Sequence, residues 1–230
     1  PRQHEVGGLG TIKLAGRPKL VTHLVTQGDK GLTPIVIPPA PQRNWLPLEP
    51  GILKTASTAT LSVDDNHSIL VTGANPDTDR YTIVCYTDTR EIRSIRLDAL
   101  GHPSLPNGAP GRAEKTGNFV LSEIKVTAVS LTAPEKSQIG TWADASADYS
   151  QGGWDARNAI DGNAKTGWSV GSHDAAAGYP VQRAGENPAH WAEFELAEPL
   201  GFEGGTMLVI TLEQGGEKKQ HNLGHFRLSC

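Results

Sequence analysis

The sequence lacks most of the features that mark a common functional class. Its 230 residues include two cysteines, Cys85 in an apolar run and Cys230, so it indicates no disulfide framework and we expect two free thiols. No run of 18 apolar residues occurs, and we expect no membrane span. No signal peptide is present, and because the chain begins Pro-Arg-Gln without Met, we expect it to be a fragment of a longer protein. Lysine and arginine are scattered at a net charge of −4, which argues against a nucleic-acid partner.

Several motifs of known catalytic and cofactor sites are also missing. The sequence contains no His-Glu-x-x-His motif, no phosphate-binding loop and no dinucleotide fingerprint. It also lacks the haem-attachment motif Cys-x-x-Cys-His, so we expect no haem in this chain. The eight histidines are dispersed, and His221 and His225 would share a face only on a helix, whereas the following residues favour a strand. We therefore predict that the chain is not an enzyme.

Composition and patterning favour short strands joined by turns. The sequence contains 26 glycines and 16 prolines. Apolar and polar residues alternate over 58–63, 81–86, 92–97 and 119–126, and turn-forming clusters separate these segments. Residues 1–44 are richer in glycine and proline, so we expect an irregular, extended arm with one or two strands. The rest of the chain is predicted to be all-β.

An internal repeat suggests how the strands are divided. Residues 117–122 and 224–229 both read Gly-x-Phe-x-Leu-Ser, and each follows a strand-like segment, 95–98 and 210–213 respectively. Repeats of this kind indicate related structural units. We predict two sandwiches, residues 45–128 and 129–230, with the closing strand of the second cut short at Cys230. A single sandwich with long insertions is the alternative.

A resemblance to known families sharpens this prediction. Residues 145–146 read Ala-Ser and residues 159–168 read Ala-Ile-Asp-Gly-Asn-Ala-Lys-Thr-Gly-Trp, which resembles discoidin (F5/8 type C) domains and related carbohydrate-binding modules. A wider set resembles a region of large planctomycete cytochrome-c-like proteins that carry PSD1 (DUF1553) domains; its segments are 79–82, 95–100, 104–106, 108–112, 117–123 and 224–229. The sequence departs from that pattern at Ala109 and at residues 115–116. The resemblance implies two tandem galactose-binding-like jelly-roll β-sandwiches in a secreted or periplasmic protein.

The resemblance also implies a structural calcium ion at residues 161–166. Calcium binds carboxylate, hydroxyl and carbonyl oxygens, and Gly162 permits the sharp bend of this loop. A glutamate on the closing strand completes the cage in the resembling families. That glutamate is Glu123 in the first half, whereas Cys230 takes its place in the second half and is a poor ligand for calcium. The predicted metal ligands are Asp64, Asp65, Ser68, Glu123, Asp161 and Thr166. The alternative for Asp161 and Thr166 is an Asx-turn without metal.

Aromatic and polar residues between about 140 and 190 are the candidates for glycan contact. Flat rings pack against the C–H face of a sugar, and polar groups bind its hydroxyls. The predicted ligand-binding residues are Trp142, Tyr149, Trp154, His173, Tyr179, Arg183 and His190. The alternative for Trp142 and Trp154 is that they cover the end of the sandwich, and Trp168 is predicted to lie in the core.

The sequence therefore predicts a non-catalytic glycan-binding module of a larger secreted protein, with calcium-stabilised loops. The alternative is a structural domain that docks other domains of the parent cytochrome-c-like protein. An exposed aromatic platform among the loops would favour the first function, and an apolar patch on a sheet face would favour the second.

Overall fold

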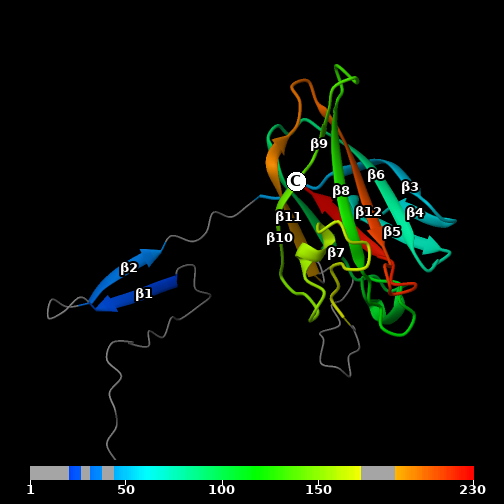
Figure 1. The fold of residues 1–230 in the computed structure, drawn as a ribbon, viewed down its shortest axis with the longest axis horizontal. Helices are drawn as coiled ribbons and strands as arrows, with labels where there is room; N and C mark the ends of the chain where they lie inside the picture. The colour runs from blue at the N-terminus through cyan, green and yellow to red at the C-terminus, as the bar shows by residue number, and fades with distance from the viewer. Residues whose placement is uncertain (1–20, 27–31, 38–43, 172–189) are drawn as a thin grey trace, which may run out of the picture. The chain divides into compact units, whose positions relative to one another are not determined.

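The chain consists of two compact units, Pro1–Asn44 and Trp45–Cys230. The computed structural model describes residues 21–26, 32–37, 44–171 and 190–230. In the first unit, β1 (Val21–Thr26) and β2 (Leu32–Ile37) form an antiparallel pair (Figure 1). The end of the predicted arm coincides with the end of this unit.

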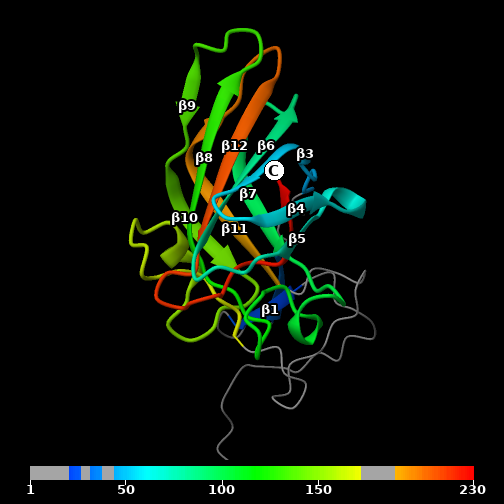
Figure 2. The ribbon, with the colours of Figure 1, turned by 90° about the vertical axis from the view of Figure 1, so that its right-hand side faces the viewer.

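The second unit contains two antiparallel sheets (Figures 1 and 2). The six-stranded sheet has the order β10 (Trp142–Ala147), β11 (His190–Leu200), β7 (Ile92–Ala99), β13 (His225–Ser229), β5 (Ile69–Gly73) and β4 (Ala59–Val63). The five-stranded sheet has the order β3 (Glu49–Thr55), β6 (Asp79–Thr87), β12 (Thr206–Gln214), β8 (Leu121–Ser130) and β9 (Ser137–Ile139). The second unit also contains three short 3-10 helices, Asp65–His67, Pro106–Gly108 and Ala156–Ala159.

These strands confirm the all-β prediction. The described ranges contain no α-helix. No helix in these ranges is long and apolar enough to cross a membrane.

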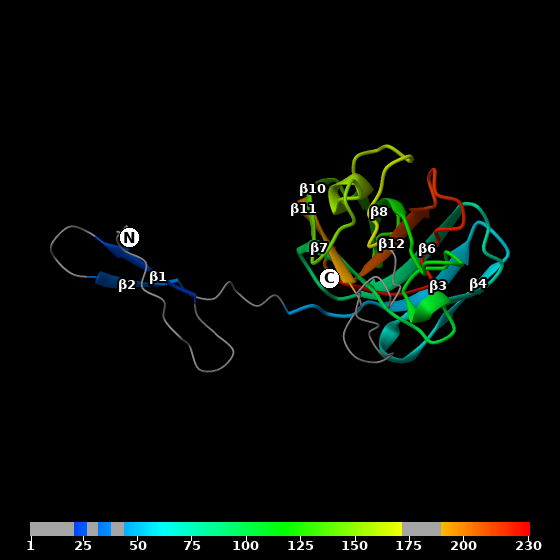
Figure 3. The same ribbon diagram turned by 90° about the horizontal axis from the view of Figure 1, so that it is seen from below.

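One apolar core lies between the sheets. Along β12 the burial alternates with a period of two, so Leu208, Ile210 and Leu212 point inward. Tyr81 on β6 and Phe226 on β13 meet across the interior, with stacked rings whose centroids are 6.1 Å apart. Figure 3 shows β10, β11 and β7 on one side of this core and β8, β12 and β6 on the other.

The single core corrects the prediction of two sandwiches. Strands from both predicted halves are interleaved within each sheet. Each repeat also takes its partner from the other half, because Leu97 on β7 faces Leu228 on β13, and Leu212 on β12 faces Ile124 on β8. Neither half contains the strand needed to complete its own sheets.

The strand predicted to be cut short is an inner strand. β13 lies between β7 and β5, and beyond Phe226 its free edge pairs with the chain just before β3. Leu46 exchanges backbone hydrogen bonds with Cys230 at 2.9 and 3.0 Å, and the N–H of Leu48 donates to the carbonyl of Leu228 at 2.9 Å. This segment therefore extends the six-stranded sheet.

Long connections gather at one end of the sandwich, which we call the loop end. They include residues 74–78, 100–120, 148–171 and 215–224, at the bottom of the sandwich in Figure 1. Isolated bridges tie them to each other and to the sheet, between Gly111 and Leu223 and between Leu121 and Trp168. Three central strands of the five-stranded sheet begin or end here, which places their terminal side chains beside the loops.

Candidate functional site at the loop end

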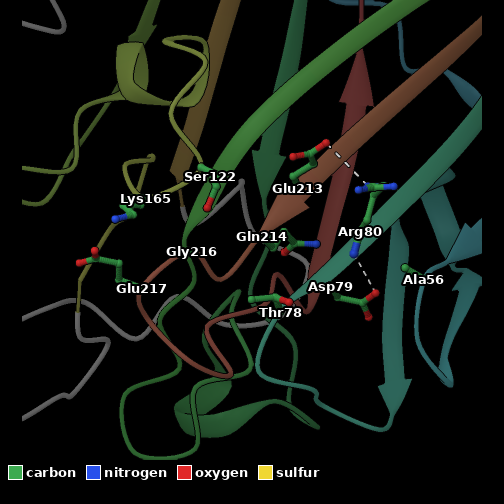
Figure 4. A pocket seen from close by; sticks show the side chains of 11 residues that line it. Ala56, Thr78, Asp79, Arg80, Ser122, Lys165, Glu213, Gln214, Gly216 and Glu217 are labelled. Carbon is green, nitrogen blue, oxygen red and sulfur yellow. Dashed lines mark hydrogen bonds and ion pairs between the residues drawn. The ribbon is translucent and has the colours of Figure 1, made fainter.

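A polar pocket of about 510 Å³ opens at the loop end (Figure 4). This volume falls in the range of about 300–1,000 Å³ that is usual for small-ligand sites. The start of β6, the start of β8, the end of β12 and two neighbouring turns form it. Its lining residues are Ala56, Thr78, Asp79, Arg80, Ser122, Ala164, Lys165, Glu213, Gln214, Gly216 and Glu217.

A β-bulge places Ser122 in the pocket. Glu213 faces Glu123 and Gln214 faces Leu121, so Ser122 is the extra residue of β8. Bulges redirect side chains and are common beside functional sites. Ser122 and Gln214 are both buried, and neither Ser122 Oγ nor Gln214 Nε2 has a hydrogen-bond partner among the described residues. Leaving such a group unpaired costs about 1–3 kcal/mol. The side chain of Gln214 also interacts with the Tyr81 hydroxyl, so Ser122 Oγ is the clearer unpartnered group at this wall.

The acidic groups of the right-hand wall in Figure 4 already have partners. Asp79 accepts hydrogen bonds from Thr55 Oγ1 at 2.8 Å, from Ser57 Oγ at 2.6 Å and from the backbone N–H of Arg80 at 2.8 Å. Glu213 lies 3.0 Å from Lys125 Nζ and 3.7 Å from Arg80 Nε. These carboxylates are held in place by neutral donors and cations.

The opposite wall belongs to the loop that resembles a calcium site. Ala164 and Lys165 come from this loop, and Glu217 lies beside Lys165 in Figure 4. Thr166 Oγ1 donates toward the Asp161 carboxylate at 2.8 Å, and the Asn163 N–H donates to Asp161 Oδ1 at 2.8 Å. The hydrogen bonds of the alternative Asx-turn are therefore present.

Glu123 is the third member of this cluster. It is only 6% exposed, and its Oε1 has no hydrogen-bond partner in the described ranges. Burial raises the pKa of this carboxyl, and the nearby Asp161 carboxylate raises it further, while the backbone N–H of Gly162 lowers it. Glu123 therefore lies near the turn of Asp161 and Thr166. The sequence had predicted Glu123 in the first sandwich, and Asp161 and Thr166 in the second.

The remaining predicted metal ligands lie elsewhere. Asp64, Asp65 and Ser68 form the β4–β5 turn of the six-stranded sheet, whereas Glu123 is on β8 of the other sheet. Asp64 Oδ1 accepts from the Asp65 N–H at 2.8 Å, and Ser68 Oγ donates to the Asp65 carbonyl at 2.9 Å. Their role in the structure is to close this turn, which corrects the prediction that Glu123 faces them.

A calcium ion in the Glu123 cluster would depend on mixed oxygen ligands. Within the described ranges, no three His, Cys, Asp or Glu side chains are placed to hold a metal ion. Calcium also accepts hydroxyl and carbonyl oxygens, so Glu123, Asp161, Thr166 and loop carbonyls fit its chemistry. The buried and unpartnered Glu123 Oε1 is the structural observation that supports this fit.

The predicted aromatic residues form no exposed platform in the described part of the chain. Trp142 Nε1 donates to the Ile124 carbonyl at 2.8 Å, and its ring packs 5.8 Å from the ring of Phe194. Tyr149 packs 5.2 Å from the ring of His190. The predicted ligand-binding residues Trp142, Tyr149, Trp154 and His190 are all partly buried.

Three further predicted contacts, His173, Tyr179 and Arg183, lie outside the described residues. Trp168 is fully buried, as predicted for a core residue. Its ring meets Phe119 edge to face at 5.1 Å, and its N–H donates to the Tyr149 carbonyl at 3.0 Å.

One motif with catalytic associations needs a structural explanation. Residues 167–171 read Gly-Trp-Ser-Val-Gly, which matches the Gly-x-Ser-x-Gly pattern of serine hydrolases. Ser169 is buried, and its hydroxyl donates toward Asn118 Oδ1 at 3.0 Å and Gln151 Oε1 at 3.2 Å. Residues 167–171 lie in a loop, where the buried and hydrogen-bonded Ser169 hydroxyl stabilises the local structure.

An apolar row crosses the outer face of the five-stranded sheet. The strand registers align Ile52, Val84, Val209, Thr127 and Ile139 across β3, β6, β12, β8 and β9. Ile139 is 79% exposed and Ile52 is 44% exposed. Four of these residues are apolar and the fifth, Thr127, is polar; we call the five together the outer apolar row.

No family model matches the sequence, and no curated protein or solved structure matches the chain. The resemblance to discoidin domains therefore stays a prediction.

Proposed function

We propose that residues 45–230 form a non-catalytic carbohydrate-binding module of a larger secreted protein, and that the glycan binds in the loop-end pocket. The observation that carries this proposal is a pocket of about 510 Å³ whose lining includes eight polar side chains that donate or accept hydrogen bonds. A sugar presents several hydroxyls, each of which donates and accepts hydrogen bonds. Such a ligand matches walls on which carboxylates and cations alternate.

The finer fold is part of the same proposal. Two antiparallel sheets around one core, with long loops at one end, are compatible with a galactose-binding-like jelly roll. Ala164 and Lys165, which directly follow the Ala-Ile-Asp-Gly-Asn motif that resembles discoidin domains, line one wall of the pocket.

We propose calcium as a structural ion beside the pocket. Glu123, Asp161 and Thr166 would hold it together with loop carbonyls. When bound, the ion would neutralise two facing carboxylates and fix the loop. The same loop supplies Ala164 and Lys165 to the pocket wall, so the ion would act on ligand binding through that loop.

A polysaccharide pull-down and a glycan array, with calcium or with EDTA, test the proposal. We expect at least one glycan to be retained with calcium and to be retained less in EDTA. Gly216→Ala is the informative variant, because a Cβ there would lie 2.8 Å from the Ala164 carbonyl oxygen and 3.1 Å from Ser122 Oγ. It is expected to weaken binding. Gly153→Ala is the matched control and should bind normally, because Gly153 also has a positive φ (84°, against 45° at Gly216) and a Cβ there meets nothing within 4 Å. The proposal is abandoned if wild-type protein retains no glycan in either condition.

The outer apolar row, together with the absence of an exposed aromatic platform among the described residues, favours a second function, docking to other domains of the parent protein. Exposed apolar rows of this kind mark interaction surfaces more often than isolated apolar residues do. The separately expressed domains of the parent should then co-purify with this unit. Ile139→Asp should abolish co-purification, and Gly216→Ala should leave it unchanged. Equal capture of both variants would argue against this surface.

A further inference from the structure

We infer that the contact between His225 and the connection 100–110 is an acid-sensitive latch, which holds this connection on β13 at neutral pH and releases it in mildly acidic conditions. The connection follows β7 and belongs to the loop end. The inference goes beyond the glycan-binding proposal and does not depend on it. Three features lead to it: the hydrogen bonds of the connection, the buried ring of His225 and the charges around that ring.

The first feature is the way the connection wraps around the start of β13. The backbone N–H of Leu100 donates to the His225 carbonyl at 2.9 Å. The N–H groups of Gly224 and His225 both donate to the Pro110 carbonyl, at 2.7 and 3.1 Å. The Leu105 side chain packs over Gly224, where an added Cβ would lie 2.7 Å from both of its methyl carbons. The connection therefore covers His225.

The second feature is the buried ring of His225, which is only 8% exposed. Its Nδ1 lies 3.2 Å from the Gly101 carbonyl oxygen. Because a carbonyl oxygen only accepts, Nδ1 carries the proton of the neutral ring and Nε2 carries none. Nε2 is buried and has no hydrogen-bond partner in the described ranges. Protonation would therefore add an N–H and a positive charge at a place where no described group accepts them.

The third feature is the set of charges that face this ring. Burial is the main cause that lowers the pKa of His225, and the Gly101 carbonyl acts in the opposite direction. The ring of His102, in the connection, meets that of His225 edge to face at 5.3 Å and lowers this pKa when it is charged. Asp64, in the β4–β5 turn, raises it, and Arg227, further along β13, lowers it. The folded protein therefore favours the neutral form of His225.

The connection is the part that can yield when His225 is protonated. β13 lies between β7 and β5 in the six-stranded sheet, so it is held along both edges. The connection has a solvent-exposed side, on which Pro103, Ser104 and Asn107 lie. Local opening begins in segments of this kind, and release of the connection would expose the charged ring to water.

The direction of the pH response follows from these two states. In the released state, His225 has its ordinary pKa of about 6.5, whereas in the latched state its pKa is lower. The released state therefore binds the proton more tightly, and the latch loses stability as the pH falls below about 6.5. The ratio of released to latched protein rises roughly tenfold per pH unit until the pKa of the latched state is reached.

Hydrogen–deuterium exchange of the intact protein at pH 7.5 and pH 5.0 tests the inference. Labelling times are scaled for the pH dependence of exchange in an unstructured chain. We expect the scaled exchange of residues 100–110 to be roughly tenfold or more faster at pH 5.0. Residues 206–214, on β12, should exchange equally at both pH values. Equal protection of residues 100–110 at both values would overturn the inference, and so would an equal acid loss in β12.

Two variants test the assignment to His225. His225→Asn keeps a side-chain N–H for the Gly101 carbonyl and has no group that titrates, so its connection should be equally protected at both pH values. His221→Asn is the matched control, because His221 is another histidine of the loop end, with its Nδ1 2.8 Å from the Lys219 carbonyl oxygen. It should keep the acid response of wild type. The same acid response in folded His225→Asn protein would overturn the assignment.

NMR titration of the His225 imidazole in wild type provides the test if His225→Asn does not fold, which thermal melting at pH 7.5 shows. We expect a midpoint below the ordinary value of about 6.5, with the amide resonances of residues 100–110 changing over the same pH range. A midpoint at or above that value, or amide resonances that do not follow the titration, would overturn the latch.

Discussion

At the residue scale, the Glu123 carboxyl connects the protonation of one group to the stability of the fold. Burial and the Asp161 carboxylate raise its pKa in the folded state above the usual value of about 4.3. The folded state therefore binds this proton more tightly than the unfolded state does. The contribution of Glu123 to stability is fully present below about pH 4 and is lost as the pH rises through its folded pKa.

Urea unfolding in EDTA at a series of pH values checks this prediction. The quantity compared is the free energy of unfolding of wild type and of Glu123→Gln. The variant should gain stability relative to wild type as the pH rises above about 4, because glutamine carries no charge. Calcium should remove that gain by stabilising the wild-type carboxylate. Asp64→Asn, in the β4–β5 turn, should behave like wild type in both conditions. A pH-independent difference between wild type and Glu123→Gln would contradict the assigned environment.

At the element scale, an ion-pair network joins two inner strands. Asp98 on β7 accepts from Arg96 Nε at 2.7 Å and from Arg227 Nη2 at 2.9 Å, and Arg227 belongs to β13. The Asp98 side chain is only 4% exposed. The guanidinium of Arg96 also stacks between Trp45, at 5.7 Å, and Trp191, at 4.7 Å. This network fixes the outer face of the six-stranded sheet where β7 meets β13.

Asp98→Ala should lower the free energy of unfolding by about 3 kcal/mol, because it leaves two guanidinium groups without their shared partner. Asp144 provides the control, since it pairs with Arg157 at 2.7 Å but is 50% exposed. Asp144→Ala should change stability much less than Asp98→Ala does, because solvent screens this exposed pair. Equal losses in the two variants, measured by urea unfolding, would show that burial of the network has no effect.

At the scale of the whole molecule, the exchanged strand pairs make residues 45–230 one folding unit. Fragments 45–128 and 129–230 should each be unfolded or aggregated, because each lacks inner strands of both sheets. Mixed together and refolded, they should regain the far-ultraviolet circular dichroism and the cooperative unfolding of the intact unit. A cooperative thermal transition in either fragment alone would contradict this prediction.

The sequence predicted the local elements of this unit better than their partners. The alternating segment 92–97 lies within β7, segment 81–86 lies within β6, and segment 58–63 covers β4. Alternation is a local property, because side chains on a strand point to opposite faces. Pairing is a long-range property, and the two Gly-x-Phe-x-Leu-Ser segments are compatible with either partner. The repeat therefore suggested pairing within each half, whereas the structure pairs across them.

The same limit applies to the candidate site. The turn around Asp161 and Thr166 followed from its own residues, since Asx-turns are formed by local hydrogen bonds. Ser122, Gln214 and Glu217 were missed, because each is an ordinary polar residue until the bulge on β8 and the 215–217 turn bring them together. Gln214, a polar residue directly after the strand-like segment 210–213, was the one signal in the sequence.

The position of β13 also has a consequence for the order in which the protein can mature. His225–Ser229 inserts between β5 and β7, which precede it in the chain by more than a hundred residues. During synthesis, β5 and β7 are made early. Their backbone edges stay unpaired until β13 has been synthesised. Exposed strand edges are templates for aggregation. The nascent chain would therefore be most vulnerable to aggregation, and most dependent on chaperones, in the interval before β13 emerges from the ribosome.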